Sequence, residues 1–120
     1  MFKIADLMVS PLICIDAQST VEQAALIFGE KRISSLVVTE NDDHVGILTK
    51  SDVINKLVGK GLPPKTTKVA DIMSTPLYKM DHYMPPKSAN ELMKKKAIKH
   101  LVITDLGKAV GILTLRDMIS

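Results

Sequence analysis

The sequence predicts a mixed α/β protein, α+β in its layering, built from two copies of one βαββα unit. Two observations lead to this fold class: a gapless internal repeat, and the same order of strand and helix patterns in each copy. A third observation limits the size of the fold. The 120 residues, 46% of them hydrophobic, suffice for a small packed core but leave no room for a separate catalytic domain.

The repeat appears at an offset of 65 positions, which aligns residues 4–54 with residues 69–119. Of the 51 aligned pairs, 19 are identical, whereas ordinary composition would give roughly three or four. We expect one motif over residues 1–58, a linker over 59–68 and a second motif over 69–120. A unit this small buries too little apolar surface to fold securely alone, so the two should pack about an approximate twofold axis.

Each copy begins with a short strand and a helix. The strands are expected at residues 12–15 and 77–80, bounded by a proline before them and an aspartate after them. Capping-box patterns that begin at Thr20 and Ser88 predict where the helices start. The predicted core stripes are Val21, Ala24, Ala25 and Phe28 in the first copy, and Ala89, Leu92, Met93 and Ala97 in the second.

A hairpin and a second helix complete each copy. Strands are expected at 36–39 and 45–48 around a polar turn at 40–44, and again at 101–104 and 110–113 around 105–108. The second helix should begin at Thr49 or Thr114, and the first of these should run toward Gly59.

Composition narrows the function classes. The net charge of +3 is scattered along the chain and aromatic content is 3%, with no Trp, which argues against nucleic acid as a partner. No apolar run approaches the ~18 residues that span a bilayer and no signal-peptide pattern opens the chain, so we expect a cytoplasmic protein without membrane contact. Cys14 is the single cysteine, which excludes an intrachain disulfide, and its predicted core strand suggests an inert buried thiol.

One motif could carry chemistry. The sequence Gly-Ile-Leu-Thr-x-x-Asp runs from Gly46 to Asp52 and again from Gly111 to Asp117, each time where a strand passes into a helix. The glycine would let a ligand approach the backbone, and the carboxylate could accept two hydrogen bonds from a ribose diol. The same Thr-x-x-Asp spacing also satisfies a capping box without any ligand. Both interpretations stay open, and they are compatible.

The repeat resembles the CBS domain, and the tandem pair resembles a Bateman module that stands alone. The resemblance is carried by the openings Asp-Leu-Met-x-Ser-Pro and Asp-Ile-Met-Ser-Thr-Pro, by the strand entries at residues 33–38 and 98–103, and by the two Gly-Ile-Leu-Thr-x-x-Asp closings. It implies a regulatory module that binds AMP, ADP, ATP, S-adenosylmethionine or a related adenosyl compound, signals to a partner protein and forms homodimers. It implies neither a cofactor, nor a metal, nor catalysis.

The resemblance also implies two clefts, each lined by both copies. In the first, Asp117 would hold the ribose hydroxyls, with Thr114, Arg116 and Lys99 toward the phosphate. Four residues of the first copy would enclose the adenine: Met8, Ile13, Ile33 and Ser34. In the mirror cleft, Asp52 would hold the ribose and Thr49 and Ser51 would face the phosphate. The base would there be surrounded by Met73, Tyr78 and Ile98.

The two copies differ where a phosphate would lie. Arg116 stands in place of Ser51, and Lys99 in place of Ser34. Because a guanidinium and an ammonium favour a charged phosphate, we expect the Asp117 cleft to bind a phosphorylated nucleotide more tightly. Tyr78, in place of Ile13, could stack on a base or partly fill the pocket.

The sequence also bears on two other functions. A ligand-independent interaction or dimerisation scaffold would use the Thr-x-x-Asp segments only as helix caps. An enzyme is disfavoured, because the sequence presents no acid/base pair, no nucleophile with its base and no metal cluster.

Overall fold

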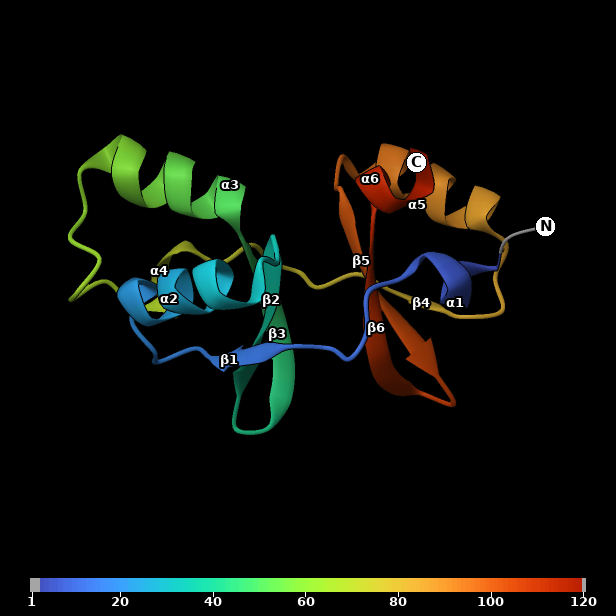
Figure 1. Ribbon diagram of the computed structural model, residues 1–120, viewed down its shortest axis with the longest axis horizontal. Coiled ribbons are helices and arrows are strands. Elements are labelled where there is room, and N and C mark those ends of the chain that lie inside the picture. Colours follow the sequence, from blue (N-terminus) through green and yellow to red (C-terminus); the bar gives the residue numbers. More distant parts are fainter. Residues whose placement is uncertain (1–2, 120) are drawn as a thin grey trace. The chain divides into compact units, whose positions relative to one another are not determined.

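The strand and helix patterns of each copy are found in a computed structural model, which describes residues 3–119 (Figure 1). The chain forms two compact units. The central unit is Ile13–Leu77, and the terminal unit joins the N-terminal residues up to Leu12 to the segment from Tyr78 onward. Each unit therefore takes its opening segment from the other repeat.

The same three-stranded sheet recurs in both units. In the central unit, β1 (Cys14–Asp16) runs parallel to β2 (Ser35–Glu40), which pairs antiparallel with β3 (Asp43–Thr49). In the terminal unit, β4 (Lys79–Asp81), β5 (His100–Asp105) and β6 (Lys108–Thr114) repeat that order and those directions. The predicted mixed α/β fold with two βαββα-like motifs is confirmed.

The two hairpin turns are tighter than predicted. Strands β2 and β3 leave only Asn41 and Asp42 between them, both with positive φ (51° and 67°), and the corresponding Leu106 and Gly107 have φ of 52° and 80°. Two consecutive residues with positive φ make the type I′ turn that suits the twist of a hairpin. The five-residue turn expected at 40–44 was wrong, because Asn and Asp tolerate this conformation and the strands extend up to them.

The long helices pack on the sheets. Helix α2 (Val21–Lys31) begins as predicted: Gln23 N–H donates to Thr20 Oγ1 over 3.2 Å and Thr20 N–H donates to Gln23 Oε1 over 2.9 Å. Helix α5 (Pro86–Lys96) instead begins two residues before Ser88, with Pro85 as its N-cap. The predicted cap at Ser88 was wrong because Pro86, with its fixed φ and missing N–H, is favoured in the first turn.

Each unit has its own hydrophobic core. In the central unit, Val21, Ala24 and Phe28 of α2 pack with strand residues that include Leu36 and Leu48. The terminal core is built around Ile4, Ala89, Met93, Leu101, Ile103 and Leu113, with Leu92 packed against it. Of the predicted stripes, only Ala25 and Ala97 are exposed. The buried faces of the two helices are therefore narrower than their apolar patterns.

The remaining helices are short. Helices α1 (Ile4–Leu7) and α4 (Val69–Ile72) lie in the opening segments, and α6 (Leu115–Ile119) follows β6. Helix α3 (Lys50–Asp52) continues as a π-helical turn, η1 (Val53–Leu57), and a 3₁₀ turn, η2 (Val58–Lys60). Gly61, with φ of 67°, ends this helical segment close to the expected position.

The opening segments are fixed to the last strands by backbone bridges. In the terminal unit, Val9 N–H donates to Ile112 O over 2.7 Å and Ile112 N–H donates to Val9 O over 2.9 Å. In the central unit, Ser74 and Ile47 exchange the same pair of bonds over 2.8 and 3.0 Å. These bridges place residues 9 and 74 at corresponding positions in the two units.

A glycine permits each of these close approaches. A Cβ at Gly111 would lie 2.7 Å from Val9 O and 2.9 Å from Met8 Sδ, and one at Gly46 would lie 2.9 Å from Ser74 O. The group that approaches these glycines is the chain itself. The suggestion that they admit a ligand is therefore wrong for this face of the strand, where the opening segment occupies the space.

Gly111→Ala and Gly46→Ala are expected to destabilise the protein by about 1–3 kcal/mol each, because the methyl group would collide with backbone oxygen. Denaturant unfolding measures the loss. Gly29→Ala is the control: nothing lies within 4 Å of its Cβ position in α2, so replacing this helical glycine should stabilise by about 0.5–1 kcal/mol. Equal effects at Gly29 and Gly111 would contradict the packing role.

Candidate functional site

Both Thr-x-x-Asp segments form reciprocal caps where a strand passes into a helix. In the central unit, Thr49 N–H donates to Asp52 Oδ2 over 3.0 Å and Asp52 N–H donates to Thr49 Oγ1 over 3.1 Å. Thr114 and Asp117 make the same two bonds at the same lengths in the terminal unit. The capping interpretation is confirmed in both units. We call these two places the Asp52 end and the Asp117 end.

In each unit, the residue after the capping threonine donates a backbone hydrogen bond to the residue just before the middle strand of the sheet. Lys50 N–H donates to Ser34 O over 3.1 Å, and Leu115 N–H donates to Lys99 O over 2.9 Å. Residues 34 and 99 are therefore neighbours of the cap in their own units. The Lys99 and Arg116 side chains are exposed around the Asp117 end, and Ser34 and Ser51 are exposed around the Asp52 end.

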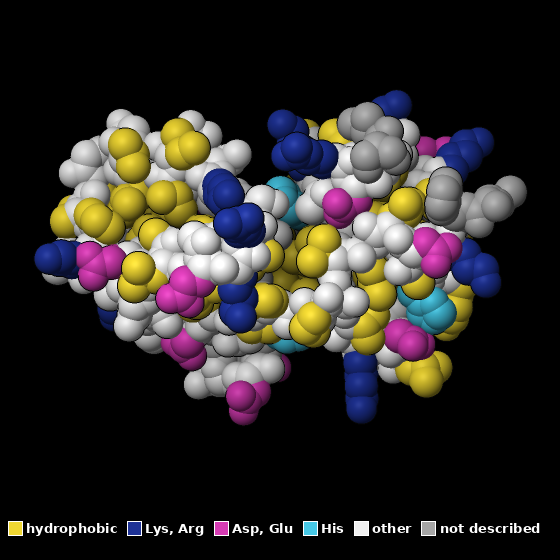
Figure 2. Space-filling model, in the orientation of Figure 1, with side chains coloured by type: hydrophobic (Ala, Val, Ile, Leu, Met, Phe, Trp, Pro, Cys, Tyr) yellow, Lys and Arg dark blue, Asp and Glu magenta, His cyan; other side chains and the backbone are white. Residues whose placement is uncertain are grey.

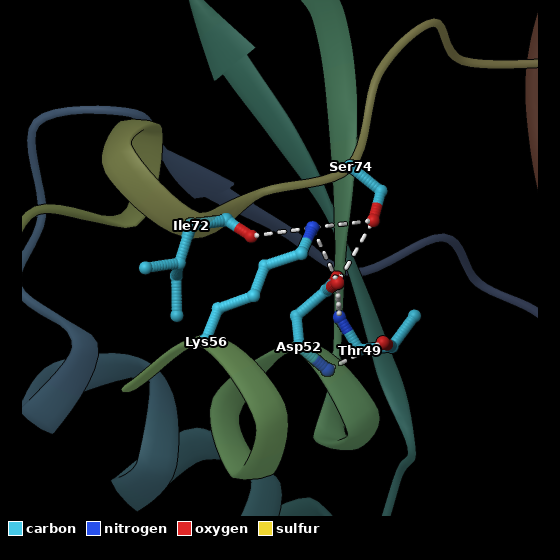
Figure 3. A network of polar contacts seen from close by, with 5 residues as sticks. All are labelled: Thr49, Asp52, Lys56, Ile72 and Ser74. Carbon is cyan, nitrogen blue, oxygen red and sulfur yellow. Dashed lines mark hydrogen bonds and ion pairs between the residues drawn. The ribbon is translucent and has the colours of Figure 1, made fainter. Parts of the chain in front are cut away.

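The carboxylate of Asp52 lies in a polar network within the central unit (Figure 3). Its Oδ1 accepts a hydrogen bond from Ser74 Oγ over 2.8 Å and lies 2.9 Å from the Lys56 ammonium. Lys56 Nζ also donates to Ser74 Oγ over 3.2 Å and to the carbonyl of Ile72 over 3.3 Å. The Asp52 side chain is 8% exposed and that of Lys56 is 41% exposed, so the acid is buried and its counter-ion reaches the surface.

This network uses most of the acceptor capacity of Asp52. A carboxylate offers about four lone-pair sites, and three are taken by Thr49 N–H, Ser74 Oγ and Lys56 Nζ. A ribose diol donates two hydrogen bonds, so it needs more than the single site that remains. Most acceptor sites of the Asp52 carboxylate are therefore occupied by groups of its own unit.

The terminal unit differs at the bridge position that Ser74 occupies in the central unit. Val9 takes the place of Ser74 in the same backbone bridge and carries no hydroxyl. Asp117 is half-buried, whereas Asp52 is buried. The two ends therefore share their caps but not their surroundings.

The apolar candidates for a base-binding wall pack against the two cores. Met73, Ile13 and Ile33 lie partly buried against the central core, and Met8, Tyr78 and Ile98 against the terminal one. Lys96 Nζ lies 5.7 Å from the centroid of the Tyr78 ring, a cation–π contact that occupies one face of that ring.

The residues expected around each adenine are divided between the two units. Thr114, Arg116, Asp117, Lys99 and Met8 lie in the terminal unit. Ile13, Ile33 and Ser34, the other residues expected around the same adenine, lie in the central unit. The mirror set divides likewise: its members in the central unit are Thr49, Ser51, Asp52 and Met73, whereas Tyr78 and Ile98 lie in the terminal unit.

Sequence reasoning missed Lys56 and Ser74. An Asp followed four residues later by a Lys is a recognised pairing on a helix, so the Asp52–Lys56 contact was readable from spacing. Ser74 was visible only as a mismatch with Val9 in the repeat alignment. Its importance depends on the backbone bridge, which carries no local sequence signal.

The other groups that could react or bind a metal are Cys14 and the His, Asp and Glu side chains. Cys14 is exposed at the start of β1, so the expected burial was wrong: a three-residue strand buries only Ile15. Desolvation raises the pKa of its thiol, which keeps it protonated. Among residues 3–119, no cluster of His, Cys, Asp or Glu could hold a metal, and no helix is long and apolar enough to cross a membrane.

The fold and the paired caps define a tandem repeat module, and comparison with known families names it. Residues 4–59 and 69–120 each match the CBS domain. The chain therefore belongs to the CBS domain family and contains a pair of such domains.

Several known proteins are similar to this chain in sequence or in structure. An uncharacterised protein of Methanopyrus kandleri is 36% identical over 87 residues, which are 72% of this chain and 44% of that protein. The inosine-5'-monophosphate dehydrogenase of Methanocaldococcus jannaschii is 30% identical over 119 residues, 98% of this chain and 23% of the enzyme. The chain thus spans less than half the length of both. A crystal structure of a conserved Pyrococcus horikoshii protein matches with a TM-score of 0.87 at 33% identity, covering 98% of this chain and 89% of that one.

A double-mutant cycle of Lys56→Met and Asp52→Asn is expected to give a coupling energy of about 1–2 kcal/mol, between the values of exposed and buried ion pairs. Urea unfolding supplies the four stabilities. The matched control is Lys68→Met with Gln18→Ala, whose hydrogen bond spans 2.8 Å at an exposed site and should couple by less than about 0.5 kcal/mol. A Lys56–Asp52 coupling no larger than that control would contradict the network.

Proposed function

We propose that this CBS pair is a regulatory module that binds an adenosine-containing ligand at the Asp117 end, catalyses no reaction and signals its occupancy to a partner protein. One observation carries the proposal. The exposed cations Lys99 and Arg116 flank the Asp117 cap, whereas exposed serines flank the same cap in the central unit.

The residues around Asp117 suit the two polar parts of a nucleotide. A half-buried carboxylate can accept hydrogen bonds from vicinal ribose hydroxyls. Arg116 and Lys99 supply a planar donor fork and a point charge for phosphate oxygens. Thr114 is already used in the cap, so its role is to orient Asp117. The half-buried Met8 is a soft apolar side chain that lies against Gly111, the first residue of the motif that ends at Asp117, and we propose that it contacts the base.

A signalling role is supported by a relative in which a similar segment is part of an enzyme. The M. jannaschii dehydrogenase carries a similar segment as 23% of its length, so a CBS pair can be joined to a catalytic chain. For the present chain, we propose that ligand occupancy shifts a conformational equilibrium that a partner surface reads. Such a shift requires the ligand to bind one state better than the other.

Asp117→Ala is expected to abolish the thermal shift that an adenosyl ligand produces in the wild-type protein. Screening AMP, ADP, ATP, S-adenosylmethionine and adenosine would identify the ligand, because saturation at a hundred times the dissociation constant adds about 2.7 kcal/mol of stability. Arg116→Ser, which installs the residue found at position 51, should weaken AMP binding about tenfold and leave adenosine binding unchanged.

The control for this screen is Thr104→Ser, a conservative change in β5 away from the cap, which should keep the full shift. If no adenosyl compound shifts the wild-type melting temperature, the ligand proposal is wrong. The caps would then be structural, and the scaffold alternative would stand.

The scaffold alternative has an observation of its own. Ile54 and Val58, four residues apart on the helical segment after Asp52, are 62% and 68% exposed. Figure 2 shows hydrophobic side chains gathered over this part of the central unit. An exposed apolar stripe of this kind favours protein contact, and we propose that a second copy of the chain covers it in a homodimer.

Replacing both Ile54 and Val58 by Lys is expected to shift a dimer to monomer, because the stripe would carry two charges that an apolar interface cannot solvate. Sedimentation velocity measures the state. Leu106→Lys is the matched control, because Leu106 is 86% exposed but lies in the terminal hairpin turn. A wild-type monomer, or a dimer indifferent to the double change, would refute this interface.

A further inference from the structure

We propose that a basic surface of the terminal unit binds an acidic segment of the partner protein, and that the phosphate of the nucleotide competes with this segment. The inference rests on the proposed function and deepens it, because it names the chemistry of the partner and the way in which ligand occupancy is read. The basic surface consists of exposed side chains at the end of α5 and near the Asp117 end: Lys94, Lys95, Lys96, Lys99 and Arg116.

The end of α5 has a fixed backbone. Ile98 N–H donates to Met93 O over 3.0 Å, and Ala97 N–H donates to Lys94 O over 3.3 Å. With Ala97 at φ of 54°, these two bonds make a Schellman motif, which ends a helix in a defined direction. Lys99 therefore follows the last turn of the helix at a fixed position.

The start of α6 lies beside this segment. Leu115 N–H donates to Lys99 O over 2.9 Å, and α6, which carries Arg116, contacts α5 (Figure 1). Figure 2 shows Lys and Arg side chains around this part of the terminal unit. The five cations, which come from three separate stretches of sequence, thus form one surface.

The charge of this surface is not neutralised by its own unit. None of the five cations forms an ion pair within residues 3–119. The single acid of α5, Glu91, lies about one turn before the lysines. The helix dipole favours cations in the last turn, which accounts for residues 94–96. It does not account for Lys99 and Arg116, which lie outside α5.

The corresponding surface of the central unit is different. Residues 94–99 contain four lysines and no acid, whereas residues 29–34 contain two cations and one acid, Glu30. Ser51 stands in place of Arg116. Helix α2 nevertheless ends as α5 does, because Arg32 also has φ of 54°. The fold therefore does not require the basic surface, which belongs to the terminal unit alone.

The shape of the surface favours a flexible acidic chain as its occupant. Consecutive helical residues point about 100° apart, so residues 94–96 spread over roughly 200° around the helix axis. A flat bilayer reaches only part of such a spread, whereas an extended peptide can follow it. Single-stranded nucleic acid needs aromatic side chains on which its bases stack, and here Lys96 already covers one face of the Tyr78 ring. Asp and Glu side chains supply the opposite charge.

Competition follows from two shared cations. Lys99 and Arg116 belong both to the basic surface and to the proposed phosphate site, and one guanidinium fork cannot hold a phosphate and a carboxylate in the same geometry. The nucleotide therefore binds better to the chain without the docked segment. By linkage, the segment loses affinity by the same factor when the nucleotide is bound. The two states that the nucleotide distinguishes are then the chain with and without its partner.

The experiment is fluorescence anisotropy of a labelled oligoglutamate peptide titrated with the full chain at low salt. Wild type should bind this peptide but not an oligoglutamine of the same length. Lys94→Gln/Lys95→Gln should weaken oligoglutamate binding about tenfold and leave AMP binding unchanged, because both residues lie outside the proposed phosphate site. Lys99→Gln should weaken both. AMP at ten times its dissociation constant should weaken peptide binding about tenfold, whereas adenosine, which has no phosphate, should not.

The matched control is Lys31→Gln/Arg32→Gln, which removes two exposed cations from the corresponding helix end of the central unit. It should leave oligoglutamate binding unchanged. Circular dichroism checks that each variant is folded. A labelled oligothymidine and phosphatidylserine vesicles test the other classes of anionic partner.

The outcomes separate the two proposals. No peptide binding, equal losses in the Lys94/Lys95 variant and the control, or tighter binding of oligothymidine or vesicles would overturn the acidic-segment surface. AMP that binds but leaves the peptide affinity unchanged would overturn competition and leave the proposed function intact. The expected pattern of peptide binding, without binding of any adenosyl compound, would uphold the surface and overturn both competition and the proposed function.

Discussion

The architecture depends on the backbone bridge between each opening segment and the last strand of its sheet. This contact is made of two short hydrogen bonds beside a glycine, and it admits no Cβ on the strand. It also joins chain segments from different repeats, because residues 3–12 complete the terminal unit and residues 69–77 complete the central one. Through it, Ser74, a residue outside the repeated Gly-Ile-Leu-Thr-x-x-Asp motif, reaches the capped Asp52.

The two Thr-x-x-Asp ends illustrate how one local structure can serve different purposes. Each cap satisfies backbone donors at the start of a helix, and that role is complete without a ligand. What the carboxylate can do beyond capping depends on its other oxygen and on the groups around it. In the central unit, a serine and a lysine both contact that oxygen. The cap and the network together therefore occupy most of the acceptor sites of this buried carboxylate.

Sequence alone predicted much of this fold and part of the site. The repeat indicated the element order, and short apolar runs bounded by turn residues located all six strands of the described chain to within a few residues. The misses have local causes: Pro86 moved a helix start that a capping pattern had placed at Ser88, and Asn41 with Asp42 shortened a turn. The Thr49–Asp52 and Thr114–Asp117 caps were predictable because they lie within four residues.

The Asp52–Ser74 contact was not predictable in this way, because its partners are 22 residues apart and meet only through the bridge. The exchange of opening segments between repeats has the same consequence for function. A duplicated motif begins with two equal ends, and a single change in the opening segment of one copy alters the acid of whichever unit that segment completes. Divergence at positions 9 and 74 is therefore a direct physical route from a symmetric pair to one whose two capped acids have different neighbours, and it leaves both caps, both sheets and both glycine contacts unchanged.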